Sequence, residues 1–191
     1  MKRPRIATTE SEPEVENDIV VINENVYFHC EVSNKTVLKL IQSLSEASEN
    51  AIKKCEKLKE AYVYLYINSG GGDAFAGLSA MDHIRCNKVP IITIADGFVA
   101  SAATLLLLGG YERKSLWNAK ILIHQISTEF WGKHADLLDE VENSKELMNS
   151  LNEIYTYYTT MKSAKVQELI KKEIHMNSSK ALSCGIVDDV W

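Results

Sequence analysis

Apolar residues follow two spacings along this chain, and the order of the two predicts an α/β protein. Short runs rich in β-branched and aromatic residues, typical of buried strands, occur at 19–22, 26–28, 62–68, 91–95, 121–123 and 186–187. Apolar residues recur at helical spacing within 34–44, 74–86, 135–160, 166–174 and 178–183. Because strand, glycine-containing turn and helix repeat in that order, we predict a parallel or mixed sheet with helices packed on it.

Two segments differ in composition from the rest of the chain, one polar and one apolar. Residues 1–18 are polar and acidic without periodicity, which predicts a flexible N-terminal arm before one domain over residues 19–191. The basic start is followed by acidic residues instead of an apolar run, so no secretory signal is expected. The most apolar run, Phe98–Leu108, is about half of the ~20 residues that a membrane helix needs. We therefore expect this run inside the protein and no contact with a membrane.

Length and charge narrow the classes of function. The 191 residues carry 26 acidic and 21 basic side chains, a formal charge of -5, with no long basic stripe to follow a phosphate backbone. Nucleic-acid binding is therefore disfavoured. The four cysteines form no C-x-x-C pair, which favours reduced thiols in a cytosol-like compartment and no zinc site. One domain of this size leaves no room for a nucleotide-driven motor, so an energy-dependent role would need a partner.

Three consecutive glycines, Gly70 to Gly72, end the strand at 62–68 and precede a helix. Their N–H groups can approach a substrate without intervening side chains, as in an oxyanion cradle. A phosphate-binding loop is one alternative, because Gly72–Gly77 has the glycine spacing, but Leu78 stands where that motif needs a lysine. An ordinary strand-to-helix turn is the other.

A serine and a histidine follow two further strands. Ser101 lies among small residues at the start of an apolar helix, where the helix dipole stabilises developing negative charge, although an ordinary N-cap serine fits the same position. His124 ends the strand at 121–123, at the sheet edge where α/β proteins place their sites. A serine nucleophile also needs a carboxylate to orient its base. Spacing does not choose among the candidates Asp136, Asp139, Glu173, Asp188 and Asp189.

Four motifs together resemble the proteolytic subunits of the Clp protease family, ClpP. They are Tyr64–Gly72, Gly97–Ala103, Ile123–Gln125 and Ala181–Asp189, which occur in the family's order within a resemblance that covers residues 24–191. The resemblance implies the ClpP/crotonase-like fold, a repeated β-β-α superhelix with a protruding handle helix at about 126–160.

The resemblance also implies roles for individual residues. Ser101 would be the nucleophile and His124 the general base, with the backbone N–H groups of Gly72 and Ala102 as the oxyanion hole. Counting back from Gly185, the family's catalytic aspartate falls on Glu173, one methylene longer with the same charge. We therefore hypothesise that Glu173 orients His124, with Asp136 as the fallback.

The function implied is that of a serine endopeptidase that hydrolyses unfolded polypeptides inside two stacked seven-membered rings. An AAA+ unfoldase that binds ATP would feed the rings, and this chain would bind no cofactor. Tyr64 and Tyr66 match aromatic positions of the family's unfoldase-docking cleft, although half-buried strand aromatics fit the same pattern. The expected location is the cytoplasm, an organelle stroma or matrix, or a host cytosol if the chain is virus-encoded.

Two alternatives belong to other classes of protein. A crotonase-type acyl-CoA enzyme shares the fold and the glycine-turn oxyanion hole but needs no serine nucleophile. A catalytically silent ClpP-like ring subunit would need neither Ser101 nor His124.

Overall fold

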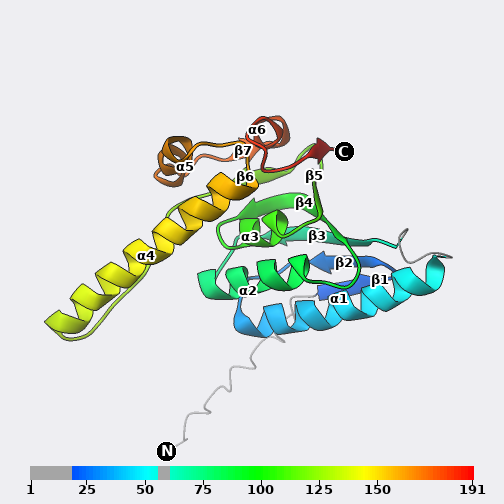
Figure 1. The fold of residues 1–191 in the computed structure, drawn as a ribbon, viewed down its shortest axis with the longest axis horizontal. Helices are drawn as coiled ribbons and strands as arrows, with labels where there is room; N and C mark the ends of the chain where they lie inside the picture. Colours follow the sequence, from blue (N-terminus) through cyan, green and yellow to red (C-terminus); the bar gives the residue numbers. More distant parts are fainter. Residues whose placement is uncertain (1–18, 56–60) are drawn as a thin grey trace, which may run out of the picture.

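A computed structural model describes residues 19–55 and 61–191 and has the predicted α/β architecture, with helices α1, α2 and α3 on one face of a mixed sheet (Figure 1). The predicted N-terminal arm lies outside the described residues. The strands are β1 (Ile19–Ile22), β2 (Asn25–Phe28), β3 (Val63–Ser69), β4 (Ile91–Ala100), β5 (Glu112–Ser115), β6 (Lys120–Leu122), β7 (Met176–Asn177) and β8 (Asp189–Val190). The helices are α1 (Asn34–Lys54), α2 (Ala74–Arg85), α3 (Ala103–Leu108), α4 (His134–Tyr158), α5 (Ser163–Ile170) and α6 (Ser178–Ser183).

The sheet has the strand order β1-β2-β3-β4-β5-β8, and β2 to β5 and β8 run parallel. β1 forms an antiparallel hairpin with β2, while β6 pairs with the last residues of β4 and then with β7. Because β3, β4 and β6 are parallel, their carboxyl ends lie at one edge of the sheet. The glycine turn, Ser101 and His124 all follow these ends.

The helices bury the apolar face of the sheet. Every residue of α3 is buried, so the prediction that Phe98–Leu108 belongs inside the protein holds for this helix. α1 begins at Asn34 and is capped by Ser33, whose hydroxyl accepts the N–H of Thr36 in a capping box. Leu38, one of the apolar residues of the helix predicted at 34–44, does not face the core and is 60% exposed.

Three strands, β5, β7 and β8, differ from the sequence prediction, which expects no strand at Glu112–Ser115 or at Met176–Asn177. β5 carries three charged residues, so the pattern of apolar residues does not reveal it. The guanidinium of its Arg113 has hydrogen-bond partners, because it donates to Asp188 and to the carbonyl of Tyr158. At the carboxyl end, the strand predicted at 186–187 is instead β8 at Asp189–Val190. Ile186 and Val187 are buried outside any strand, so burial alone produced the strand-like pattern.

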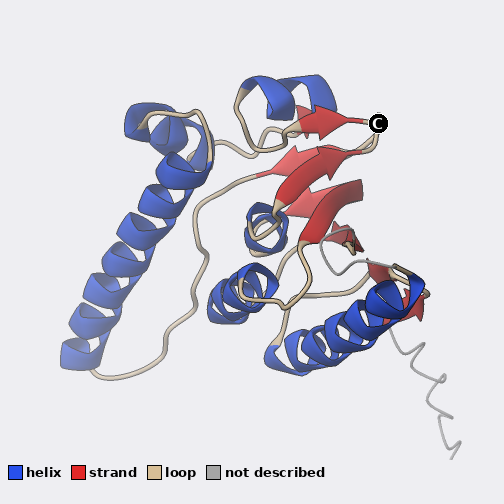
Figure 2. Ribbon diagram, turned by 45° about the vertical axis from the view of Figure 1, so that its right-hand side comes forward, coloured by secondary structure: helices blue, strands red, loops and turns tan. Residues whose placement is uncertain are grey.

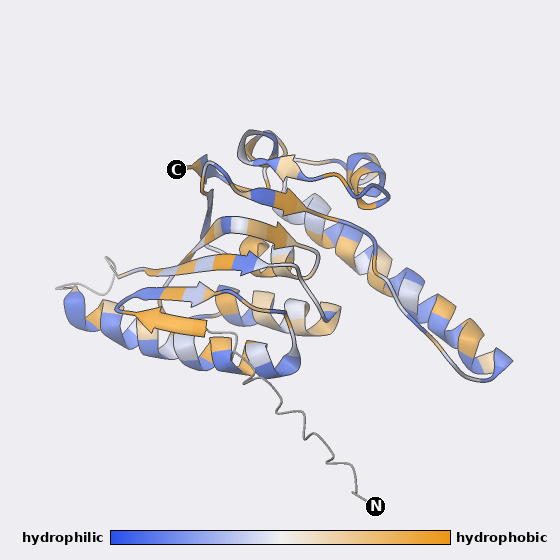
Figure 3. Ribbon diagram, turned by 180° about the vertical axis from the view of Figure 1, so that it is seen from behind, coloured by the Kyte–Doolittle hydropathy of each residue, from blue (hydrophilic) through white to orange (hydrophobic). Residues whose placement is uncertain are grey.

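α4 projects beyond the sheet, and the loop before it runs alongside the helix (Figures 1 and 2). Apolar and polar segments alternate along it (Figure 3), as expected for an amphipathic helix. Only Leu151 and Tyr155, in its carboxyl-terminal half, are buried. Leu137, Leu138 and Val141 are 45%, 57% and 45% exposed, so the apolar stripe of the other half contacts no core of this chain.

Tyr155 attaches α4 to the body of the protein. Its hydroxyl forms a buried hydrogen bond with Thr104 Oγ1, which itself donates to the carbonyl of Ser101. Since the threonine proton is used in that second bond, the Tyr155 hydroxyl is the donor in the first. Burial raises the pKa of Tyr155 to about 12, and the bond to Thr104 opposes this only in part.

The burial of Tyr155 predicts that the folded state loses stability at high pH. The unfolded chain releases the Tyr155 proton near pH 10 and the folded chain near pH 12, so the folded state holds more protons between these values. The free energy of unfolding should therefore fall as pH rises through this window, by about 2 to 3 kcal/mol from this residue. Urea unfolding at pH 9 to 12 should show a shallower fall for Tyr155→Phe. Tyr157→Phe, at a side chain 80% exposed, should follow the unsubstituted chain, and equal slopes for all three would contradict the prediction.

Candidate active site

Ser101 occupies a sharp turn between β4 and α3. Its φ of 55° is in the left-handed region, which among the described non-glycine residues only Asn23 shares. Three backbone hydrogen bonds hold it there: its N–H donates to Leu122 O at 2.9 Å, and its carbonyl accepts Thr104 N–H at 2.9 Å and Thr104 Oγ1 at 2.6 Å. A strained residue fixed this firmly at a strand end is typical of a site where side-chain direction matters.

The glycine turn packs directly against Ser101. A Cβ on Gly71 would lie 2.6 Å from Ser101 Cβ and 2.7 Å from Ala100 O, and its φ of 98° disfavours any side chain. Gly72 needs the absence of a Cβ for a different reason, because that atom would lie 2.2 Å from Val32 O. The two glycines therefore let the turn lie between Val32 and Ser101.

Two N–H groups beside Ser101 are available to a ligand. Gly72 and Val32 form a parallel β-bridge. Its two hydrogen bonds run from the Val32 N–H to the Gly71 carbonyl and from the Asp73 N–H to the Val32 carbonyl, so the N–H of Gly72 points away from Val32. Within the described part of the chain, neither Gly72 N–H nor Ala102 N–H donates in a turn or loop hydrogen bond. Unpaired donors in this position can stabilise negative charge on a substrate oxygen.

His124 follows β6 and opens onto the same cavity as Ser101 and Gly72, a space of about 670 Å³. The next residue fixes the chain here, since Gln125 N–H donates to Ile170 O at 2.8 Å. Among the described residues, His124 has no hydrogen bond or ion pair, including none to Ser101 Oγ. The structure thus brings serine and histidine to one cavity without the bond that would join them.

Glu173, the predicted third member, lies in the segment between α5 and β7. It is exposed and does not line the cavity. β7 pairs with β6 through Ile121 and Met176, and continuing this register by three residues on each chain would set Glu173 opposite His124. The pairing stops before that point, and Glu173 forms no hydrogen bond or ion pair with a described residue.

Other predicted carboxylates have different partners. Asp136 accepts the Lys133 N–H at 3.3 Å and caps the start of α4, the end of the helix far from β6 in Figure 1. Asp188 pairs with Arg113. Neither lines the cavity, so the structure gives no support to Asp136 as the fallback.

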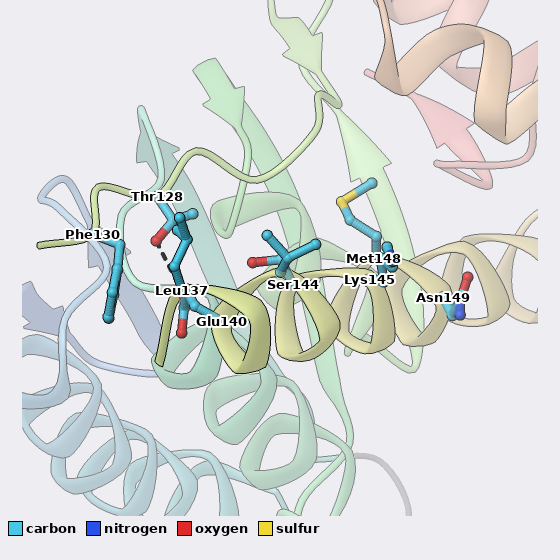
Figure 4. Close-up of a pocket in the computed structure, with 9 residues that line it drawn as sticks. Thr128, Phe130, Leu137, Glu140, Ser144, Lys145, Met148 and Asn149 are labelled. Atoms are coloured by element: carbon cyan, nitrogen blue, oxygen red, sulfur yellow. Dashed lines mark hydrogen bonds between the residues drawn. The ribbon is translucent and has the colours of Figure 1, made fainter. Parts of the chain in front are cut away.

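α4 forms a wall between two cavities. Glu140 and Ser144 line the cavity that holds Ser101 and also a second one of about 590 Å³. Figure 4 shows this second space, where Phe130, Leu137 and Met148 supply apolar surface. The loop before α4 is held to the helix by the bond from Thr128 Oγ1 to Glu140 at 3.3 Å (Figure 4).

Tyr64 and Tyr66 lie in β3, half-buried, and alternate with buried residues that face the helices. Tyr66 stacks on Tyr27 of β2 with ring centroids 4.8 Å apart, and burial raises its pKa. They therefore lie on the sheet face opposite α1, α2 and α3, away from the packed core.

Three contributions to the site had no sequence signal of their own. Thr104 and Tyr155 appear in the sequence as members of apolar helices, and only the fold brings them to the backbone of Ser101. Gly71 was part of a glycine run whose members could not be distinguished before their φ values and neighbours were known.

Two features are absent from the described residues. No three His, Cys, Asp or Glu side chains there are grouped so as to hold a metal ion. No helix in that part of the chain combines the length and apolar character needed to cross a membrane.

Comparisons with known proteins give a family. The family model described as Clp protease matches residues 16–191. A curated relative, the ATP-dependent Clp protease proteolytic subunit of Deinococcus radiodurans, is 33% identical over 133 residues, which cover 69% of this chain and 65% of that protein. The match thus spans less than two thirds of the relative's length. The family model, however, includes the glycine turn, Ser101 and His124 as well as the whole described fold, and we conclude that the chain belongs to the Clp protease family.

Proposed function

We propose that this protein is a serine endopeptidase that cleaves unfolded polypeptides through an acyl-enzyme. The observation that carries the proposal is the strained turn at Ser101, which opens with His124 and Gly72 onto one cavity. The turn presents a hydroxyl, and unpaired N–H groups lie next to it. This combination suits attack on a carbonyl that becomes an oxyanion.

In the proposed mechanism, His124 takes the proton of Ser101 Oγ as the oxygen attacks the scissile carbonyl. The N–H groups of Gly72 and Ala102 stabilise the oxyanion, and His124 then gives the proton to the leaving amine. Water, deprotonated by His124, hydrolyses the ester and restores the serine. His124 must come within hydrogen-bond distance of Ser101 for this cycle, a closure that bound substrate or assembly can supply. Glu173 orients His124 and balances its charge when it is protonated.

The proposal includes the assembly and partners that the family resemblance implies. The relative is named as the proteolytic subunit of an ATP-dependent protease, which supports a division of labour between this chain and an AAA+ unfoldase. We propose two stacked rings of seven subunits, with the unfoldase docking at the sheet face that carries Tyr64 and Tyr66. A cytoplasm-like compartment is part of the same proposal.

Neither alternative is favoured by the family match. A crotonase-type acyl-CoA enzyme needs no serine nucleophile, so the strained backbone at Ser101 would serve no purpose in its reaction. A silent ring subunit does not need a serine and a histidine that line one cavity.

Labelling with a fluorophosphonate probe tests the nucleophile. We expect mass spectrometry of the assembled full-length protein to find the phosphonate on Ser101, and Ser101→Ala to lose both labelling and peptide cleavage. Ser127→Ala, a change at another serine of the cavity wall, is the control and should keep both. A label elsewhere, or none on assembled protein, would exclude a Ser101 peptidase.

The glycine turn gives a second test. Gly71→Ala should cost about 1 to 3 kcal/mol of unfolding free energy and should slow probe labelling, because the new Cβ would displace Ser101. Gly70→Ala is the matched control, since its Cβ would meet nothing within 4 Å. It should label at the normal rate. Thermal unfolding and labelling rates of both variants decide the matter, and normal labelling of Gly71→Ala would be the contrary result.

The third test concerns Glu173. If this carboxylate orients His124, Glu173→Gln should lower kcat by at least about 100-fold with little change in KM, while Glu173→Asp should retain activity. Glu153→Gln, at an exposed position on α4, controls for the loss of one surface charge. Unchanged kcat in Glu173→Gln, with Ser101→Ala inactive, would remove Glu173 from the mechanism.

A further inference from the structure

The cavity that holds Ser101 is lined by three carboxylates and by no lysine or arginine of the described chain. Asp73 contributes from the start of α2, and Glu140 and Glu146 contribute from α4. Because they come from the start of α2 and from α4, the three charges are contributed by two separate elements around one cavity. A substrate residue next to the scissile bond would enter a negative environment.

Bonds within the chain do not cancel this charge. Asp73 accepts the N–H of Ala76 as a helix cap, and Glu140 accepts a hydroxyl proton from Thr128, so neither has a cationic partner among residues 19–55 and 61–191. Within the described part of the chain, the carboxylate of Glu146 has no hydrogen bond or ion pair. The adjacent cation, Lys145, pairs with Glu142 at 3.3 Å and lines the other cavity.

The rest of the lining suits a long side chain with a charged end. Leu78, Ile126 and Leu147 provide apolar surface for a methylene stem, and the carboxylates provide acceptors for its head. A metal ion is a poorer occupant, because no three His, Cys, Asp or Glu side chains of the described residues are grouped to hold one. Lysine and arginine combine a stem with a positive charge.

We propose that this cavity selects a lysine or arginine side chain beside the scissile bond, so that the peptidase prefers basic substrate segments. The inference rests on the proposed peptidase function and adds its substrate class. Glu140 and Glu146 are the specificity-determining residues. Because both are partly or largely exposed, salt screens them, and the expected preference is about fivefold, declining as ionic strength rises.

The test compares peptides that differ in charge and hardly in shape. Arginine and its neutral analogue citrulline are placed in turn at the residue before and the residue after the scissile bond, and kcat/KM is measured on the assembled full-length protein. At the substrate position whose side chain enters the cavity, kcat/KM should be about fivefold higher for arginine than for citrulline at low salt. Glu140→Gln/Glu146→Gln should lower the ratio toward one, with Asp73 as the remaining carboxylate. Glu142→Gln, the same charge change on the same helix outside the cavity, should leave it unchanged.

Binding separates this inference from the proposed function. Ser101→Ala should bind the arginine peptide more tightly than the citrulline peptide in fluorescence anisotropy, by the same factor, without cleaving either. If the peptides are cleaved with no arginine preference at either position, the peptidase function stands and the inference is overturned. If no peptide is cleaved but Ser101→Ala prefers arginine, the peptidase function fails and the charge selection by the cavity stands. Equal binding of both peptides overturns the inference whatever the cleavage result.

Discussion

The left-handed backbone of Ser101 is the constraint on which the site depends. β4 continues through Gly97, with a φ of 73°, to Ala100, and the chain must then reverse into a fully buried helix. Leu122 and Thr104 hold the Ser101 peptide groups from both sides of this reversal. β6 must therefore lie beside the end of β4, and the glycine turn must approach without a side chain. The pairing of β6 with the end of β4 and the glycine at position 71 meet these requirements.

The backbone conformation of Ser101 is also linked to the place where α4 attaches to the body of the protein. Tyr155 reaches Thr104 in the protein interior, and Thr104 bonds the Ser101 carbonyl, so a continuous set of hydrogen bonds runs from the helix to the strained residue. A buried hydroxyl pair is stable only when each group has a partner, which both have here. The helix that forms the outer wall of the cavity is thereby tied to the turn that forms its floor.

The helices and strands that could be predicted from the sequence are those determined by the spacing of nearby apolar residues. Strand β3 and helix α2 follow from the apolar run and from helical spacing. The parts that the sequence pattern missed depend on partners distant in the chain. β5 is a strand because its backbone pairs with β4 and with β8, which lies near the carboxyl end of the chain. Leu137 belongs to the apolar pattern of the helix predicted at 135–160 but is 45% exposed, because periodicity cannot tell which apolar faces meet a neighbour. Glu173 is assigned by counting back from Gly185 to the family's catalytic aspartate, and the single chain does not bring it into contact with His124.

The double role of α4 as wall and projection has a thermodynamic consequence. One face of the helix borders the space above Ser101, while Leu137 and Val141 expose apolar surface elsewhere along it. Any molecule that covers that surface and restrains the helix also restrains the wall, and a ligand that restrains the wall favours the covering molecule by the same free energy. Occupancy of the site and association of the protein are therefore reciprocally linked, and the affinity measured for one depends on the concentration of the other.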